Sequence, residues 1–336
     1  MSDLELHYGY LRRSAGVLDL SSRSRVCVTG PDRQRFINGQ VTNNVKDLKG
    51  GQGCYAALVT AKGKMQSDLF IYCLPDELLL DFEPGLTAAV MERLERYVIA
   101  DDVQVVDVGS VYGLLTVQGP RSADVARAVG LEPPSAPLNW SRSESTGGEI
   151  YSMSNARGTV AGFDVFVPAE QVRAMRERLV QAAAKVQGGA SSVEALEIVR
   201  IESGIPKFGV DMDETNLASE AGIEARAISY SKGCYIGQEV ISRVRAFGQV
   251  ARSLRGLRFP AELPQFPQKG HKLFRDGKDV GYVTSSCRSH ALQLVVALGY
   301  VRREHNSSGT ELHLGAPDSP VKAVVCDLPF VAPNAV

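Results

Sequence analysis

The chain has 336 residues, of which 44% are hydrophobic, and a formal net charge of −1. This length and composition fit two or three globular domains with substantial cores. The near-neutral charge argues against a general polyanion binder but leaves room for local basic patches. The first residues, MSDLELHYGYLRRSAG, resemble neither a secretory signal nor a transit peptide, and no apolar run approaches the roughly 20 residues that span a bilayer. The sequence therefore predicts a soluble, cytoplasmic protein without a membrane segment.

Short runs rich in β-branched and aromatic residues predict strands in the first third of the chain, at 25–30, 54–60, 67–74, 77–83 and 103–108. The spacing of apolar residues predicts a helix over 85–98. Segments 25–37 and 113–129 share one pattern: an apolar strand, Gly-Pro, and then a helix-like stretch whose first position suits proline. The echo indicates two related α+β units, or only the same way of joining a strand to a helix.

The middle of the chain continues this mixture of strands and helices. Residues 132–148 are predicted to form a loop, with Trp140 covering the edge of a core. A strand is expected at 163–167, followed by a helix that ends at the Gly-Gly pair at 188. Another helix is expected to begin at Ser191, whose spacing to Glu194 fits a capping box.

Beyond about residue 250, short strands alternate with glycine, proline and charged turns. That texture predicts a separate C-terminal domain, either a small antiparallel barrel or a sandwich. The arginine-rich stretch at 243–259 leads into it. An RNA-facing surface there is unlikely, because interleaved apolar residues favour a helix or strand with a solvated arginine face.

Six cysteines are scattered along the chain without a C-x-x-C pair, which favours free thiols over a disulfide framework or a zinc site. Cys287 has C-x-x-H spacing to His290, but no second pair completes a metal shell, so an exposed loop thiol is expected there and no metal site. Four others are expected to be buried because they lie in apolar strand runs: Cys27, Cys54, Cys73 and Cys326.

Cys234, in SKGCYIGQEV (231–240), has the strongest claim to a function. An apolar helical stripe follows it, so the thiol is expected in the first turn of a helix. Free backbone N–H groups, the helix dipole and Lys232 would favour a thiolate there. Gly233 and Gly237 fit a close backbone approach to a ligand, although a tight turn explains them equally well. Function is favoured over packing, but no histidine lies nearby in the sequence to act as a base.

Two carboxylates and one arginine are further candidates. By strand alternation Asp68 shares a face with Phe70 and Tyr72, and Asp164 lies opposite its apolar neighbours. Either carboxylate is expected to be solvated or to hold the N–H groups of a flat heterocycle. Arg200, within an apolar helix, is expected to bind a carboxylate tail or to pair with Glu197 one turn back.

Two glycine-containing segments are weaker candidates for phosphate binding. GQGCYA (51–56) has the glycine spacing of a dinucleotide fingerprint, but it continues into a strand rather than opening a helix. AKGKM (61–65) lacks the remaining residues of a P-loop and is expected to form a hairpin turn. Neither segment supports nucleotide binding.

KGCYIGQE (232–239) resembles the signature of the YgfZ family of folate-binding, iron-sulfur-cluster-assembly proteins, which are relatives of the glycine-cleavage T-protein. The resemblance covers nearly the whole chain and includes VTGPDRQRFINGQVTNNV (28–45) and RIESGIPKFGVDMDETNLASEAGI (200–223). It implies a three-lobed α+β fold. Two intertwined lobes, within residues 1–250, would form a channel for tetrahydrofolate, and residues 251–336 would form an antiparallel β-barrel.

The resemblance also implies roles for particular residues. Asp68 falls where the T-protein has a pair of acidic residues, with Ser67 replacing the first of them. Asp164 matches an acidic residue that holds the pterin, and Arg200 matches an arginine near the folate. The signature adds further residues to the expected folate site: Lys232, Tyr235, Gln238 and Glu239. Cys234 and Asp68 would be the catalytic residues.

One departure from the T-protein decides between two functions. A T-protein typically carries Asp-Phe where this chain has Cys234 and Tyr235, and a different residue where it has Gln238. The resemblance therefore implies a tetrahydrofolate-binding protein that supports iron-sulfur enzymes, with client enzymes or assembly factors as partners. Because Asp68 could steer a proton near the folate nitrogens, aminomethyl transfer remains the alternative. Whether the chain is an enzyme, as a folate-dependent one-carbon transferase, is left open.

Overall fold

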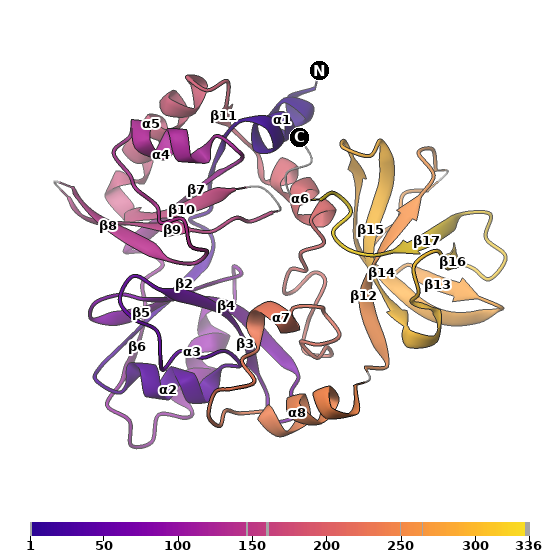
Figure 1. The fold of residues 1–336 in the computed structure, drawn as a ribbon, viewed down its shortest axis with the longest axis horizontal. Coiled ribbons are helices and arrows are strands. Elements are labelled where there is room, and N and C mark those ends of the chain that lie inside the picture. The colour runs from indigo at the N-terminus through magenta and orange to yellow at the C-terminus, as the bar shows by residue number, and fades with distance from the viewer. Residues whose placement is uncertain (1, 146, 159–160, 249, 264, 333–336) are drawn as a thin grey trace.

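The computed structural model describes residues 2–145, 147–158, 161–248, 250–263 and 265–332. They form three lobes, of which two are α+β and the third is a closed barrel of six antiparallel strands (Figure 1). The predicted three-lobed α+β architecture is therefore confirmed. Of the two alternatives for the C-terminal domain, the barrel is correct and the sandwich is not.

The first lobe is a five-stranded antiparallel sheet in the order β3-β4-β5-β2-β6. Its strands are β2 (Ser24–Thr29), β3 (Gly53–Val59), β4 (Met65–Cys73), β5 (Glu77–Phe82) and β6 (Gln104–Asp107). Its helices are α2 (Arg33–Gln40) and α3 (Thr87–Glu95). In β4 the alternation divides the side chains between two faces. Leu69 and Ile71 enter the core of this lobe, whereas Asp68 and Phe70 face away from that core.

The second lobe is a six-stranded sheet in the order β11-β1-β7-β10-β9-β8. Its elements are α1 (Asp3–Arg13), β1 (Gly16–Asp19), β7 (Tyr112–Gln118), α4 (Ser122–Ala128), β8 (Trp140–Ser145), β9 (Gly148–Ser154), β10 (Gly162–Pro168), α5 (Val172–Ala184) and β11 (Gly189–Ala190), with a 3₁₀ turn at Ala169–Gln171. Strand β1 pairs with β7 although the whole first lobe separates them in sequence. The chain therefore crosses between these lobes twice, before β2 and after β6.

The Gly-Pro echo has a common structural cause in the two lobes. Gly30 follows β2 with φ 97°, and Gly119 follows β7 with φ 131°. A Cβ atom at Gly30 would lie 2.2 Å from the carbonyl oxygen of Asp102, and one at Gly119 would lie 2.3 Å from that of Ser14. Both turns therefore need glycine. The prolines do not start the helices as predicted, because α2 begins at Arg33 and α4 at Ser122.

A long segment after the second lobe returns along the first lobe before it enters the barrel (Figure 1). It contains α6 (Val193–Glu202), α7 (Glu224–Ala227) and α8 (Gln238–Phe247). Helix α6 is predicted correctly apart from its cap, which is Ser192 instead of Ser191. The Ser191 hydroxyl donates instead to the backbone of His7. Side chains of α6 join the large central core that also contains residues of all three lobes.

The barrel has the strand order β12-β15-β14-β13-β16-β17. Its strands are β12 (Arg252–Phe259), β13 (Lys272–Arg275), β14 (Lys278–Ser289), β15 (Leu294–Arg302), β16 (Glu311–Leu314) and β17 (Lys322–Cys326), with a 3₁₀ turn at Arg303–His305. The arginine-rich stretch forms α8 and β12, as expected. Its side chains have partners within the chain: Arg243 pairs with Glu239, and Arg255 pairs with Asp327.

Further local predictions are wrong, among them the burial of Cys54 and Cys326, which are only partly buried. Part of the expected loop at 132–148 is the edge strand β8, which pairs with β9. Trp140 at its start does cover a core edge, as expected, and its indole donates to the Cys73 carbonyl at 3.0 Å. Cys287 is not an exposed loop thiol. It lies in β14 and is 7% exposed, because barrel strand alternation turns it into the central core.

Two kinds of feature are absent from the residues that the structure describes. None of the described helices combines the length and the apolar character that crossing a membrane requires. Nor do the described His, Cys, Asp and Glu side chains assemble into a group of three or more that could hold a metal ion.

Candidate functional site

A cavity of about 180 Å³ is lined by residues from both α+β lobes and from the segment that contains α6 and α7. The lining is partly apolar, with Leu20, Phe70, Leu196, Ile205 and Ile223. The polar lining comes from different strands and connections: Asp19, Ser22, Arg23, Tyr55, Asp68, Glu83, Arg157, Glu197, Arg200, Lys207 and Arg226. An apolar pocket with a few convergent polar groups is the usual form of a small-molecule site.

Asp68 is the lining residue with a buried side-chain oxygen that has no hydrogen-bond partner among the described residues. Its Oδ2 accepts from the Tyr55 hydroxyl at 2.7 Å, across the β3–β4 pair. Its Oδ1 is buried and has no hydrogen-bond partner among the described residues. Burial raises the pKa of the Asp68 carboxyl to about 6, and the negative charge of Glu83 acts in the same direction. A carboxylate in this state is available to an N–H donor from a ligand.

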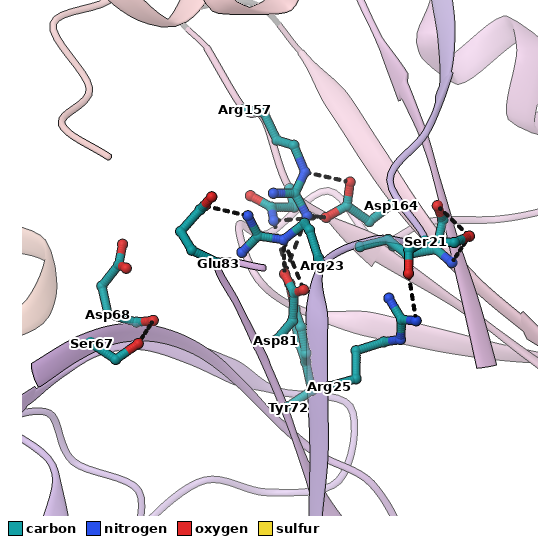
Figure 2. A network of polar contacts seen from close by, with 12 residues as sticks. Ser21, Arg23, Arg25, Ser67, Asp68, Tyr72, Asp81, Glu83, Arg157 and Asp164 are labelled. Carbon is teal, nitrogen blue, oxygen red and sulfur yellow. Dashed lines mark hydrogen bonds and ion pairs between the residues drawn. The ribbon is translucent and has the colours of Figure 1, made fainter. Parts of the chain in front are cut away.

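The charged groups beside Asp68 satisfy one another instead. Arg23 donates to Asp81 at 2.8 Å and also pairs with Glu83. Asp81 lies in β5, and Glu83 directly follows that strand. Arg157 bridges Asp81, at 3.3 Å, and Asp164, at 2.6 Å. Figure 2 shows this network, with the Asp68 carboxylate standing apart from it. The network crosses between the two lobes and fixes one wall of the cavity.

Asp164 is fully buried, and both of its oxygens are engaged. Oδ1 accepts from Arg157 at 3.0 Å, and Oδ2 accepts from Arg157 and from Asn155 at 2.8 Å. Asp164 is not a lining residue, whereas Arg157 is. The structure thus places Asp164 behind Arg157, so that it orients this guanidinium. Its predicted contact with a pterin stays a prediction.

Arg200 lines the cavity from α6, but its guanidinium is saturated. Its Nε donates to the Glu197 carboxylate at 2.9 Å, and its Nη2 donates to the same carboxylate at 2.6 Å. The remaining donors go to Asp211 at 2.7 Å, to the Ile205 carbonyl and to Ser285 of the barrel at 3.2 Å. All five N–H groups of an arginine are therefore used within the chain. The predicted pairing of Arg200 with Glu197 is confirmed, whereas the binding of a ligand's carboxylate tail by Arg200 stays a prediction.

Cys234 is exposed, and it precedes its helix instead of opening it. Helix α8 begins at Gln238 because Gly237 takes a left-handed conformation, with φ 85°, and turns the chain. The expected place of the thiol in the first helical turn is therefore wrong, and with it the helix-dipole argument. None of the predicted signature residues lines the cavity. Glu239 pairs on the surface with Arg243 at 2.8 Å.

Lys232 anchors the loop that carries Cys234. Its ammonium donates to the carbonyl oxygens of Asn38, Val41 and Asn43 at 2.6, 2.8 and 2.7 Å. These three acceptors match the three N–H groups of an ammonium. The same Nζ lies 4.9 Å from the centre of the buried Tyr235 ring. Burial lowers the pKa of Lys232 to about 8 and raises that of Tyr235 to about 12.

Several functional candidates have no strong local signal in the sequence. Tyr55 lies in a strand, and only its pairing with β4 brings it to Asp68. Arg23, Asp81 and Arg157 meet because two lobes come together. Asp81, a charged residue in the otherwise largely apolar strand β5, is the one signal in the sequence that points to this network.

The fold defines a three-lobed α+β protein with a partly apolar cavity between its two α+β lobes and the segment of α6 and α7. Residues 6–232 match the model of the GCVT N-terminal domain, and residues 252–332 match that of the glycine cleavage T-protein C-terminal barrel domain. The chain belongs to the GCVT family.

Relatives extend over almost the whole chain. An aminomethyltransferase of Halalkalibacterium halodurans is 26% identical over 334 residues, covering 98% of this chain and 90% of the relative. One of Streptomyces coelicolor is 26% identical over 325 residues, covering 92% and 86%. The crystal structure of the glycine cleavage system aminomethyltransferase T from Bartonella henselae superposes with a TM-score of 0.88 at 23% identity, covering 99% of this chain and 90% of that one. This last likeness concerns the fold.

Proposed function

We propose that the chain binds tetrahydrofolate in the central cavity. The observation that carries the proposal is the buried Oδ1 of Asp68, which has no donor among the described residues. The pterin ring of a folate presents N–H groups in one plane, and apolar lining residues such as Phe70 and Ile223 suit its flat faces. A carboxylate at Asp68 would accept those N–H groups and so recover the free energy that its desolvation costs.

Asp164 and Arg157 support the proposed folate site indirectly. Arg157 reaches the lining and lies 5.6 Å from the centre of the Phe70 ring. Asp164 and Asp81 hold this guanidinium on both sides. In the proposed complex, Arg157 would keep the cavity wall at Phe70 rigid, and Asp68 would supply the hydrogen-bond acceptor.

Titration calorimetry with tetrahydrofolate tests this proposal. Wild-type protein is expected to bind at pH 7.5, and Asp68→Asn, which keeps the shape but removes the acceptor charge, is expected to bind at least about tenfold more weakly. Loss of a hydrogen bond to a charged group has about this effect. Binding of equal strength by the Asn variant would contradict the assigned role of Asp68, and no binding by wild type would contradict the function.

We further propose that the bound folate serves the synthesis or repair of iron-sulfur enzymes, in the manner of the YgfZ family, with Cys234 as the functional thiol. The exposed position of Cys234 on a loop held by Lys232 supports contact with a macromolecular partner, such as a client enzyme or assembly factor. In cells lacking the protein, Cys234→Ala is expected to fold normally but to fail to restore iron-sulfur enzyme activity. Full restoration by this variant would exclude the thiol.

Aminomethyl transfer to tetrahydrofolate is the second candidate. It is supported by Asp68, because burial raises the pKa of its carboxyl to about 6, a value suited to proton transfer near neutral pH. The names of the relatives point the same way. Incubation with aminomethyl-loaded lipoyl protein and tetrahydrofolate would release ammonia and form methylene-tetrahydrofolate if this candidate is correct, and neither product if it is not.

A further inference from the structure

A second cavity, of about 410 Å³, lies in the second lobe and shares no lining residue with the first cavity. It is bounded by the last turns of α1, by the residue that precedes α4 and by the turn after α5. Figure 1 shows these three helices at the end of the second lobe that is turned away from the first lobe. The second cavity is therefore separate from the one in which folate binding is proposed.

Hydrogen bonds of the buried Ser14 tie the walls of this cavity together. Its hydroxyl donates to the carbonyl oxygen of Val186, and its own carbonyl oxygen accepts from the Arg121 N–H at 2.9 Å. The Ser14 N–H donates to the carbonyl oxygen of Tyr10 in α1 at 3.1 Å. Contacts within the chain therefore form the cavity in advance of any ligand.

Three basic side chains reach the second cavity from three different elements. Arg13 ends α1, Arg121 directly precedes α4, and Lys185 directly follows α5. Arg13 and Lys185 are exposed, and neither makes an ion pair with a residue that the structure describes. Arg121 pairs with Asp124, which also pairs with Arg127. None of the described lining residues carries a carboxylate, so the lining is positively charged.

The place of the Arg13 side chain follows from a glycine one turn earlier in α1. Glycine inside a helix lowers its stability relative to alanine, yet Gly9 lies in the middle of α1. A Cβ atom at this position would lie only 2.6 Å from Arg13 Nη2. Because that atom is absent, the guanidinium can lie against the backbone of α1, and both residues line the cavity.

The ends of the helices account for only part of this positive charge. A helix C-terminus carries about half a negative charge, and both α1 and α5 end at the cavity. The two ends together offset about one of the three positive charges. Asp124 is shared between two arginines and does not line the cavity. A net positive charge therefore remains in a concave site, and an anion is the complementary ligand.

We propose that the second cavity binds a small ligand through its phosphate groups. A tetrahedral phosphate presents oxygens in several directions, so it can meet cations that come from three elements, whereas a carboxylate presents two oxygens in one plane. Arginine forms paired hydrogen bonds with phosphate oxygens, and lysine binds them as a point charge. A volume of about 410 Å³ is typical of small-molecule sites and leaves room for the rest of the ligand. Folate binding in the other cavity is not required for it.

Titration calorimetry with inorganic pyrophosphate at pH 7.5 tests this proposal. Wild type is expected to bind pyrophosphate with a dissociation constant below about 1 mM in about 50 mM salt, and more weakly at higher salt. Citrate, a tricarboxylate of similar charge, is expected to bind at least about threefold more weakly, which corresponds to the loss of one exposed ion pair. Absence of pyrophosphate binding, or equally tight binding of citrate, overturns the proposal.

A double variant and a matched control test the assigned residues. Arg13→Gln combined with Lys185→Gln is expected to weaken pyrophosphate binding about tenfold, the value of two exposed ion pairs, and to unfold at the same temperature as wild type. Arg96→Gln combined with Arg173→Gln removes the same charge from arginines that are 65% and 91% exposed and lie outside the lining. This control is expected to keep wild-type affinity. Wild-type affinity in the first variant, or an equal loss in the control, overturns the proposal.

Discussion

The cavity wall around Asp68 and the loop around Cys234 differ in how their polar groups are satisfied. In the wall, a buried carboxylate oxygen of Asp68 lacks a donor among the described residues, although the nearby Arg23 and Arg157 are paired with carboxylates. In the loop, the buried Lys232 has all three donors satisfied, and the thiol it supports is exposed. The wall is thus prepared for a small ligand, and the loop for presenting a side chain. This difference predicts that folate binding and the proposed thiol chemistry of Cys234 are separable.

Lys232→Met is expected to have the largest effect on stability. It leaves three carbonyl oxygens without the ammonium, which should lower the free energy of unfolding by about 2–4 kcal/mol. Denaturant unfolding checks this, with the exposed Lys62→Met in the β3–β4 turn as a control expected to change stability by less than about 0.5 kcal/mol. If the two regions are separable, the folded Lys232 variant binds tetrahydrofolate as wild type does. A loss of affinity as large as that of Asp68→Asn would show that they are coupled.

Asp68→Asn is expected to stabilise the fold while it weakens ligand binding. Because burial raises the pKa of the Asp68 carboxyl from 3.8 to about 6, the folded state binds more protons than the unfolded state between these values. Wild-type stability should therefore fall as pH rises from about 4 to about 6, by on the order of 2 kcal/mol, and stay lower above that. The Asn variant should lack this component. If the free energies of unfolding of wild type and Asp68→Asn changed with pH in the same way between pH 4 and 7, the raised pKa assigned to Asp68 would be contradicted.

Tyr55→Phe sharpens the comparison within the wall. The hydroxyl of Tyr55 stabilises the ionised form of Asp68, so its loss should raise the pKa of that carboxyl further. Tetrahydrofolate affinity, measured between pH 5.5 and 8.5, should fall as the solution is acidified in both proteins. In Tyr55→Phe the midpoint of this fall should lie about 0.5 to 1 pH unit higher than in wild type. Tyr97→Phe, outside the cavity lining, should leave the profile in place. An unshifted Tyr55→Phe profile would argue against ionised Asp68 as the acceptor.

Cys234→Ser is expected to have the smallest effect on the folded protein. The exposed thiol packs against little, so stability should change by less than about 0.5 kcal/mol. In wild type, brief treatment with iodoacetamide followed by peptide mass spectrometry should find Cys234 modified ahead of the buried Cys27, Cys73 and Cys287. Saturating tetrahydrofolate should not slow that modification. Protection by the ligand would place the thiol within reach of the cavity.

The sequence predicts much of the fold because its local patterns are strong. Strand alternation in β4 and the helix expected to begin near residue 191 are present in the structure, and the barrel follows from its closely spaced turns. Boundaries were missed where a single residue decides them. Gly237 delays α8 by taking a left-handed conformation, and this removes Cys234 from the helix.

The site was harder to predict because it is built from long-range contacts. Asp68 and Arg200 do line one cavity, and the resemblance to a known family pointed to both. Their partners, Tyr55 and Asp211, lie 13 and 11 positions away in sequence, and only strand pairing or a loop brings them close. The pairing of Arg200 with Glu197 follows from helical spacing. The contacts of Arg200 with Asp211 and Ser285, and those of Lys232 with backbone carbonyls, depend on tertiary structure that no local pattern encodes.

A crystal structure of the protein with the stable analogue 5-formyltetrahydrofolate would test the central claim most directly. We predict that the pterin lies in the central cavity, with at least one ring N–H group within hydrogen-bonding distance of Asp68 Oδ1 and with Cys234 out of contact with the ligand. A folate bound elsewhere, or bound in the cavity with Oδ1 still lacking a donor, would contradict the account.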